Sequence, residues 1–446
     1  MRKYLYILIG FLALTLAGCN GSQSSSTTLS SVAKLVTLGF RADDSIPGLA
    51  KAVFTVEERL DTGLVYNKDS MLYGTKLNKV IPYLSFAATP SATAIIFPDT
   101  VVQYTGNDTL DFTKSPIYIS LRSGDKKNTK VYEVRASVHQ VDPDLYQWDR
   151  LNEGIYPLDD SEQKVVEWDE KFVMYASNGF ELRAFSSPDG IQWTDLGEPT
   201  GLPIGTRVRQ IISDGSTLYY GIGNNIYTSS DAVHWTEHPI SQKVITMLMH
   251  WESMVWVLTA PNESQYELAW FMGDTLNMTE MRPDGEFPVS DFATVTFTSA
   301  SGRDRAMIIG GFSEYGRSLE TRWNFEFTKY MPGGDGIFRM EEFSIGRPVS
   351  MALTGASVVY YNKQLLLFGG VNDKMTYLGR DIYISNNEGM TWTLADTTKN
   401  RLPEIYQARQ KQNAIVRDDY IYLFGGQDSK NTFSDVYRGR LNSINW

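Results

Sequence analysis

The chain has 446 residues, of which 41 are Lys or Arg and 52 are Asp or Glu, so its formal net charge is -11. A surface of this charge repels phosphate backbones, which excludes nucleic acid as an expected partner. The chain holds a single cysteine, so no disulfide within the chain and no site built from several thiolates can form.

The first residues of the sequence are expected to form an export signal. Arg2 and Lys3 precede an apolar run over residues 4–16, which small residues follow up to Cys19. The run is shorter than the roughly 20 apolar residues that a membrane-spanning helix needs, so it predicts a secretory signal. It resembles a bacterial lipoprotein signal, which implies removal of residues 1–18 and lipidation of Cys19.

A flexible tether is expected next, because residues 19–31 are rich in Ser, Thr and Gly. Residue 20 is Asn and not Asp, which by resemblance to lipoprotein sorting rules implies an outer-membrane anchor. Whether the protein faces the periplasm or the cell surface stays open.

Residues 32–142 are expected to form an Ig-like β-sandwich. Apolar and polar residues alternate in short runs separated by turn signals, which is typical of an antiparallel sandwich. The predicted strands are residues 34–40, 52–56, 64–66, 80–86, 93–97, 117–121 and 130–138.

The segments 40–46 and 66–70, followed by Gly74 and Thr75, give this region a more specific resemblance. They are similar to the N-terminal domain of an uncharacterised lipoprotein family of the Bacteroidetes, in which an Ig-like module precedes a propeller. The resemblance implies a two-domain exported protein and no assigned activity.

Two signatures repeat after residue 144. Apolar strands end in glycine pairs whose second members are Gly311, Gly370 and Gly426. Glycine allows the positive φ that a sharp strand end requires. The second signature is a turn that starts at Ser and ends at Trp, over residues 187–193, 229–235 and 385–392, where side-chain oxygens are expected to bond nearby amides.

The glycine pairs resemble kelch repeats, as in the galactose oxidase central domain, and the Ser-to-Trp turns resemble the Asp-boxes of sialidase-type propellers. The resemblance implies a six-bladed kelch-like β-propeller over residues 144–446, although five or seven blades stay open. The expected blades are residues 164–200, 206–241, 243–285, 290–346, 350–400 and 406–446.

The last repeat stops at Trp446 without an outer strand. Residues 145–151 resemble the outer strands of the other repeats, so we expect this early segment to complete the last blade. Such pairing would remove the exposed edge of an open ring. The fold class is therefore all-β, a sandwich followed by a closed propeller.

The sequence lacks residues that two kinds of propeller enzyme require. Copper chemistry of the galactose oxidase type needs a cysteine cross-linked to tyrosine, and Cys19 is the lipid anchor. His234 and His238 do not share a helical face, so no metal or other cofactor is expected. Sialidases carry an Arg-Ile-Pro stretch that this chain lacks. Another glycoside hydrolase or lyase that uses two carboxylates remains the alternative function.

The expected function is binding or scaffolding by a membrane-anchored monomer, with a glycan or a protein as the partner. Arginines precede the inner strands of several predicted blades, and their guanidinium groups suit a carboxylate or sulfate. An acidic glycan is therefore the preferred ligand. The candidate site residues are Arg207, Arg209, Arg347, Arg409, Tyr406, Asn372, Asp373 and Gln427.

Lipidation gives the first testable prediction. Radiolabelled palmitate should enter the wild-type protein in its native host and should not enter the Cys19→Ala variant, because this chain has no other thiol. Label retained in the variant would contradict the lipoprotein hypothesis.

Overall fold

The computed structural model describes residues 29–152, 161–262, 265–283, 287–328, 337–344 and 352–442. For residues 152, 321, 327, 328 and 337–344 it describes the backbone only. The predictions on Cys19, Arg347 and Trp446 therefore lie outside the described residues. Among the described helices, none has the length and hydropathy to span a bilayer. The chain divides into two compact units, one ending at Asp142 and one starting at Pro143.

The N-terminal unit contains two sheets, one with the order β1-β4 and one with the order β2-β3-β8-β7-β5-β6. Its elements are β1 (Leu35–Phe40), the 3-10 helix η1 (Leu49–Lys51), β2 (Phe54–Glu57), β3 (Thr62–Asn67), β4 (Pro82–Phe86), β5 (Ala92–Ile96), β6 (Val101–Gln103), β7 (Ile117–Arg122) and β8 (Thr129–Arg135).

Both sheets contribute to one core in the N-terminal unit. Phe40 of the small sheet packs edge-on against Phe54 of the large sheet, with ring centroids 5.4 Å apart. Ile119 and Val65 lie in the same buried cluster. The seven predicted strands all occur within three residues of their expected bounds, and β6 was missed because it is only three residues long.

One pairing corrects the expected antiparallel arrangement. β3 and β8 run parallel, with Leu64 opposite Glu133. Parallel neighbours need a long connection between them, and more than 60 residues separate these two strands along the chain. Sequence alternation shows which residues form strands and carries no information about the direction of a distant partner.

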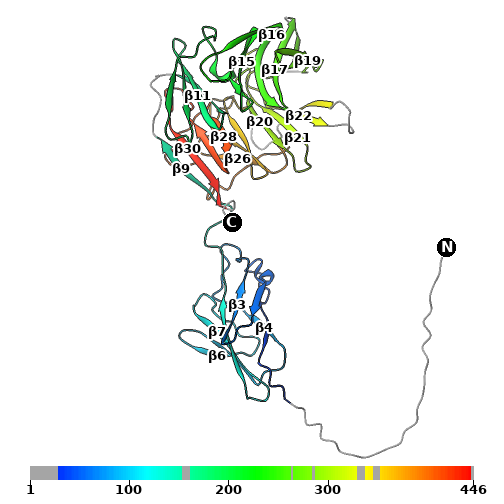
Figure 1. Cartoon of the computed structure of the whole chain (residues 1–446), viewed down its shortest axis with the longest axis vertical. Helices are drawn as coiled ribbons and strands as arrows, with labels where there is room; N and C mark the ends of the chain where they lie inside the picture. Colours follow the sequence, from blue (N-terminus) through cyan, green and yellow to red (C-terminus); the bar gives the residue numbers. More distant parts are fainter. Residues whose placement is uncertain are drawn as a thin grey trace, which may run out of the picture. The chain divides into compact units, whose positions relative to one another are not determined.

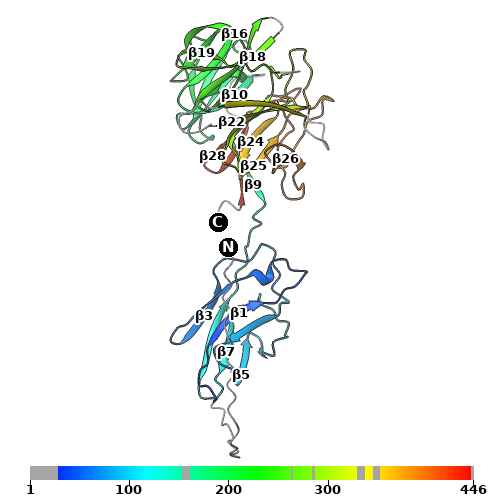
Figure 2. The same cartoon turned by 90° about the vertical axis from the view of Figure 1, so that its right-hand side faces the viewer.

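The C-terminal unit is built from antiparallel sheets (Figures 1 and 2). The first sheet comprises β10 (Glu162–Trp168), β11 (Lys171–Ser177), β12 (Leu182–Ser187) and β13 (Thr194–Gly197). The second comprises β14 (Ile212–Ser213), β15 (Leu218–Ser229), β16 (Thr236–Trp251), β17 (Met254–Asn262), β18 (Gln265–Met272) and β19 (Thr275–Met278), and the 3-10 helix η2 (Val208–Gln210) precedes it.

Three further sheets follow in the described residues. They are β20 (Ala293–Thr298), β21 (Asp304–Ile309), β22 (Thr321–Thr328) and β23 (Ile337–Ser344); β24 (Ser357–Tyr361), β25 (Gln364–Phe368), β26 (Ile382–Ser385) and β27 (Thr393–Leu394); and β28 (Asn413–Arg417), β29 (Tyr420–Phe424), β30 (Val436–Leu441) and β9 (Tyr146–Asn152).

The second sheet has more strands than the others in this unit because β15 and β16 each contain two successive segments that pair with different neighbours. The rings of Tyr220 and Tyr227 lie 6.0 Å apart, far closer than a straight strand allows for residues seven positions apart. The chain therefore reverses within β15, near Gly223, whose φ is +57°. β16 pairs through Thr236 with β15 and through Trp251 with β17.

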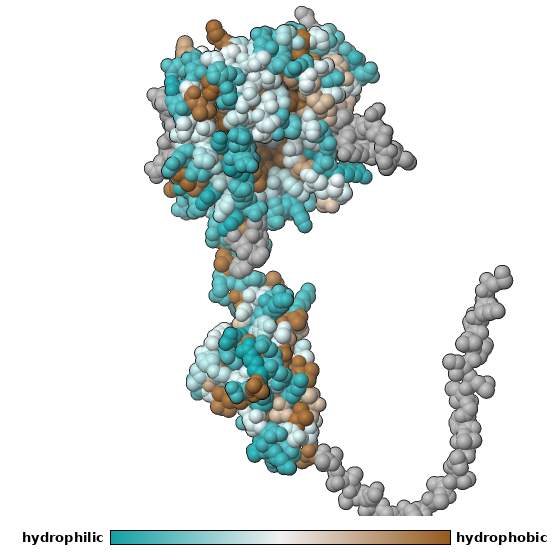
Figure 3. Space-filling model, in the orientation of Figure 1, coloured by the Kyte–Doolittle hydropathy of each residue, from teal (hydrophilic) through white to brown (hydrophobic). Residues whose placement is uncertain are grey.

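The strands nearest the centre contact one another in a closed ring. β10 contacts β14, β14 contacts β16, β16 contacts β20, β20 contacts β24, β24 contacts β28, and β28 contacts β10. Buried clusters fill the spaces between successive sheets, as where Leu353 and Val358 pack with Ala293. Hydrophilic residues cover most of the face seen in Figure 3, with hydrophobic residues in small groups.

The glycine pairs join each sheet to the next. Gly369 and Gly370 have φ values of +59° and +89°, as the sequence predicted. A Cβ on Gly369 would lie 2.8 Å from the carbonyl oxygen of Arg409, which precedes the next sheet. The amide of Gly370 donates a 2.9 Å hydrogen bond to that same oxygen. A side chain at position 369 would therefore push neighbouring sheets apart.

The Ser-to-Trp turns close on their own side chains, as predicted. Asp189 Oδ1 accepts from the amides of Ile191 and Gln192 at 2.8 and 3.0 Å. Asn387 Oδ1 accepts from the amide of Thr391 at 2.9 Å. Ala232 adopts φ +68° where the other turns have glycine.

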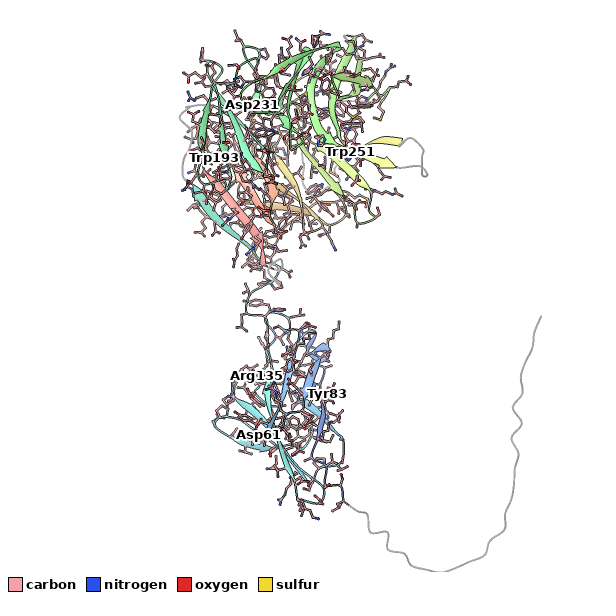
Figure 4. All side chains as sticks on the ribbon, in the orientation of Figure 1. Asp61, Tyr83, Arg135, Trp193, Asp231 and Trp251 are labelled. Carbon is pink, nitrogen blue, oxygen red and sulfur yellow. The ribbon has the colours of Figure 1, made fainter. Side chains whose placement is uncertain are left out.

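Asp231 (Figure 4) organises the turn that contains Ala232. Burial disfavours its charged form, but the amide and ring of His234 and the amide of Val233 outweigh that effect. They lower the pKa of Asp231 to about 2, so this acceptor stays ionised at neutral pH.

The early strand β9 completes the last sheet. It pairs antiparallel with β30, with Tyr146 opposite Leu441 and Trp148 opposite Gly439 (Figure 1). The Trp148 ring packs edge-on against Phe368 at 5.9 Å. The prediction that residues 145–151 supply the missing outer strand is confirmed.

This closure gives the second prediction. Deleting residues 144–151 should lower the melting temperature of the C-terminal unit by about 10 °C or more, because ladder hydrogen bonds and aromatic burial are lost together. Differential scanning calorimetry measures the shift. The exposed Gln147 on the same strand provides a matched control, and Gln147→Ala should melt close to wild type. A truncated protein that melts like wild type would contradict the closure.

Candidate functional site

A cavity of about 300 Å³ lies at the centre of the ring, where its first strands begin. We call it the mouth cavity. β10, η2, β16 and the start of β20 surround it. Its polar lining includes Glu162, Lys164, Arg207, Arg209, Gln210 and Asp291.

The mouth cavity opens a channel that follows the inner strands. A second cavity of about 450 Å³ shares Lys164 with the first and reaches His250. A third, of about 440 Å³, extends from His250 to Glu252 and Asp304 at the other end of the strands. The channel is therefore lined along its length by strands of the inner ring, chiefly β10, β14, β16 and β20.

The short helix η2 presents three of the lining side chains. Val208 and Ile211 are fully buried and fix the helix to the core. The amide of Arg207 donates to the hydroxyl of Tyr220 at 3.2 Å. With these contacts made, Arg209 and Gln210 lie along the mouth cavity.

An ionic network holds one wall of the mouth. Arg209 contacts Asp291 at 3.4 Å and donates a 2.7 Å hydrogen bond to the carbonyl oxygen of Lys411. The Lys411 ammonium contacts Glu162 at 3.4 Å and Asp291 at 3.7 Å. Both carboxylates of the mouth are therefore neutralised by Lys411 and Arg209.

Three polar groups of the mouth have no partner among the described residues. The Oε1 atom of Gln210 is buried and accepts no hydrogen bond. The exposed guanidinium of Arg207 and the ammonium of Lys164 form no hydrogen bond or ion pair there. Burial and the neighbouring Arg209 lower the pKa of Lys164 to about 7.

These groups give the mouth an excess of positive charge. Arg207, Arg209 and Lys411 outnumber the carboxylates of Glu162 and Asp291, and Lys164 adds a further charge when protonated. The other end of the channel holds Glu252 and Asp304. A field that is positive at one end attracts anions to the mouth.

Arg207 and Arg209 are thus brought together as the sequence predicted, and Arg409 is not. Arg409 is 1% exposed and pairs with Asp435, with its Nη2 atom 3.2 Å from Oδ2. Its guanidinium also lies 4.1 Å from the Phe433 ring centre. The prediction that Arg409 binds a ligand is therefore corrected: its guanidinium pairs with the buried Asp435 and has a structural role.

The remaining candidates lie away from the mouth cavity. Tyr406 is buried and donates from its hydroxyl to Gln412. Asn372 Oδ1 accepts from the amides of Lys374 and Thr376 and so closes its own loop. Gln427 exchanges backbone hydrogen bonds with Gln410, and the exposed Asp373 lines no described cavity. Arg347 lies outside the described residues.

Sequence reasoning missed Lys164, Gln210, Glu162, Asp291 and Lys411. The sequence carried no clear signal for Lys164, because its strand, Glu162–Trp168, contains three other polar residues. No local pattern indicates Asp291 or Lys411, which reach Arg209 from distant sheets.

Comparison with known proteins gives family matches for both units. Residues 142–446 match the model described as "DUF6242 beta propeller domain", and residues 25–136 match "Domain of unknown function (DUF6242) N-terminal domain". No curated protein matches the chain. One matching solved structure, described as "Structure of YjhT", is 13% identical with a TM-score of 0.43, and the match covers 64% of this chain and 95% of that one.

The different environments of Arg409 and Arg207 give the third prediction. Arg409→Met should lower the free energy of unfolding by about 3–5 kcal/mol, because it leaves Asp435 buried without its main partner. Arg207→Ala is the matched control, since this exposed side chain has no described partner, and its effect should stay within about 0.5 kcal/mol. Urea denaturation measures both. Equal stability of the two variants would show that the buried pair is not structural.

Proposed function

The chain belongs to the DUF6242 family, with the N-terminal domain followed by the beta-propeller domain. We propose that this protein binds an acidic glycan at the channel mouth. The observation that carries the proposal is the mouth cavity, where Arg207, Arg209 and Lys164 gather beside only two carboxylates, both of which Lys411 contacts.

The chemistry of the mouth favours a carboxylate or sulfate ester. A guanidinium presents parallel N–H donors that match the oxygens of such groups. Arg207 has no described partner to give up on binding, so a ligand gains this contact without breaking another. The unpartnered Oε1 of Gln210 accepts a hydrogen bond from a sugar hydroxyl, which relieves the cost of its burial.

Exposed rings in loops at the mouth end of their sheets support a sugar ligand. Ser177 pairs with Glu162, so the connection from β11 to β12 leaves its sheet at the mouth end, and it carries Phe180, which is 97% exposed. Ile309 pairs with Ala293, so the connection from β21 to β22 leaves at the same end, and it carries Tyr315, which is 78% exposed. Exposed aromatic faces of this kind suit the apolar faces of sugar rings.

The finer features of the fold form part of the proposal. We assign six kelch-like blades, because β10, β14, β16, β20, β24 and β28 form the closed inner ring. The Ser-to-Trp turns are Asp-boxes in this assignment and lie at the far end of the channel, since Ser187 pairs with Phe172 beside the turn between β10 and β11. The N-terminal domain is assigned as an Ig-like sandwich.

The same proposal covers location. A lipid on Cys19 and the tether over residues 19–31 hold the protein at the outer membrane as a monomer. In this position the propeller meets extracellular or periplasmic glycans. The surface charge of the chain argues against nucleic acid.

A glycoside hydrolase or lyase is the second candidate. Glu162 and Asp291 both contact the Lys411 ammonium, at 3.4 and 3.7 Å. The two contacting oxygens therefore lie no more than about 7 Å apart, which is compatible with the separation of carboxylate pairs in glycoside hydrolysis. Cleavage products found by mass spectrometry after incubation with an acidic oligosaccharide, and absent with Glu162→Gln, would favour this candidate over simple binding.

Binding gives the fourth prediction. In calorimetric titrations, oligogalacturonate or a chondroitin sulfate oligosaccharide should bind, and cellohexaose should not, because it lacks an anionic group. Arg207→Ala should weaken acidic-glycan binding at least about tenfold, equivalent to about 1.4 kcal/mol.

The matched control is Arg183→Ala, because Arg183 pairs with Asp195 and does not line the mouth cavity. This control should bind like wild type. Unchanged affinity in both Arg207→Ala and Arg209→Ala would overturn the proposal. If a glycan array shows no acidic ligand at all, a protein partner takes its place.

A further inference from the structure

Lys164 is the unusual residue of the channel. It lies on β10 within the ring of strands, and it lines both the mouth cavity and the next cavity. Lys164 is partly exposed to these cavities. An ammonium with restricted access to water is normally paired, yet Lys164 forms no hydrogen bond or ion pair with the described residues. The nearby carboxylates are engaged elsewhere, since Glu162 contacts Lys411 and Asp291 contacts both Arg209 and Lys411.

This position serves no evident structural purpose. Lys164 anchors no loop and joins no two sheets by an ion pair among the described residues, whereas the buried Arg409 pairs with Asp435. A lysine that contributes only an amine to an accessible cavity is placed for contact with a ligand. Such an amine can bind an anion in its charged form and can act as a nucleophile in its neutral form.

The surroundings favour the neutral form. Burial and the positive charge of Arg209 both oppose protonation and lower the pKa of Lys164 to about 7. Desolvation and a cationic neighbour are the two means by which proteins activate lysine as a nucleophile. The charged or titratable groups in or beside these cavities are Glu162, Arg207, Arg209, Asp291, Lys411, Glu167 and His250.

We propose that Lys164 is a nucleophilic amine that forms an imine with a small aldehyde or ketone carrying a carboxylate. The carboxylate lies against Arg207 and Arg209, which directs the carbonyl carbon toward the amine deeper in the channel. The proposal rests on the proposed function only for this anion site. The open-chain aldehyde of an acidic reducing sugar belongs to the same chemical class.

The reaction balances without an oxidant or reductant. The nitrogen lone pair of Lys164 attacks the carbonyl carbon, a C–N bond forms, and the carbonyl oxygen takes a proton to give a carbinolamine. Loss of the nitrogen's second proton and of the hydroxyl group releases one water and leaves a C=N bond. Glu162 and Asp291 line the cavity as groups that can accept and return the proton.

Reductive trapping tests the proposal. Full-length mature protein is incubated at pH 7 with glyoxylate and sodium cyanoborohydride, and labelled lysines are located by peptide mass spectrometry. An ordinary lysine is only about 0.04% neutral at this pH. Lys164 should therefore be labelled at least about tenfold faster than Lys171 on the next strand, an exposed lysine that serves as control in the same sample.

The pH dependence of labelling and the labelling of two variants test whether the label reports the proposed reaction. The labelling rate of Lys164 should rise through pH 7 and then level off, whereas that of Lys171 should keep rising to higher pH. Arg207→Ala should slow labelling by glyoxylate severalfold and leave labelling by acetaldehyde, which has no carboxylate, unchanged. In Lys164→Arg the fast label should disappear.

The outcomes separate this proposal from glycan binding. Equal labelling of Lys164 and Lys171, or no label at Lys164, would overturn the imine while acidic-glycan binding in calorimetry would still stand. Fast labelling of Lys164 in a protein that binds no acidic glycan would support the imine and overturn the glycan proposal alone. Peptide mapping of the wild-type protein needs no variant, so a variant that fails to fold does not remove the test.

Discussion

The structure of the C-terminal unit depends on the antiparallel pairing of β9 with β30. A ring of sheets made from one chain has two ends, and an unpaired end exposes a row of backbone donors and acceptors. Here the first strand of the unit covers the edge of the last sheet, so the ring closes through hydrogen bonds and the packing of Trp148 on Phe368. The closed ring fixes the positions of the inner strands and hence the channel.

Contacts between neighbouring sheets hold the rest of the ring together. Gly369 and Gly370 bring the end of one sheet against the carbonyl of Arg409, where a side chain would not fit. Arg409 in turn is tied to Asp435. Side chains near the axis are therefore divided between those used to hold sheets together and those left free to line the channel. Arg409 belongs to the first group, and Arg207 and Lys164 belong to the second.

The channel has the charge distribution of an anion site with an amine below it. Lys411 and Arg209 neutralise both mouth carboxylates, so the charges of Arg207 and Lys164 remain for a ligand. Desolvation and the neighbouring charge of Arg209, a member of the same network, lower the pKa of Lys164. The proposed binding at the mouth and the proposed nucleophilic chemistry below it thus depend on one network.

The sequence by itself determined the features that short segments encode. Glycine pairs at 369–370 and their relatives, the oxygen acceptors of the Ser-to-Trp turns and the alternation of the N-terminal strands act within a few residues, so they could be predicted. The outer strand at residues 145–151 was found because it resembles its counterparts. Tertiary structure decided which arginine reaches the channel, because Asp435 lies 26 residues beyond Arg409. It also decided that Lys164 stays unpaired, since Asp291 and Lys411 meet Arg209 only after distant sheets close the ring, and no local pattern records such long-range contacts.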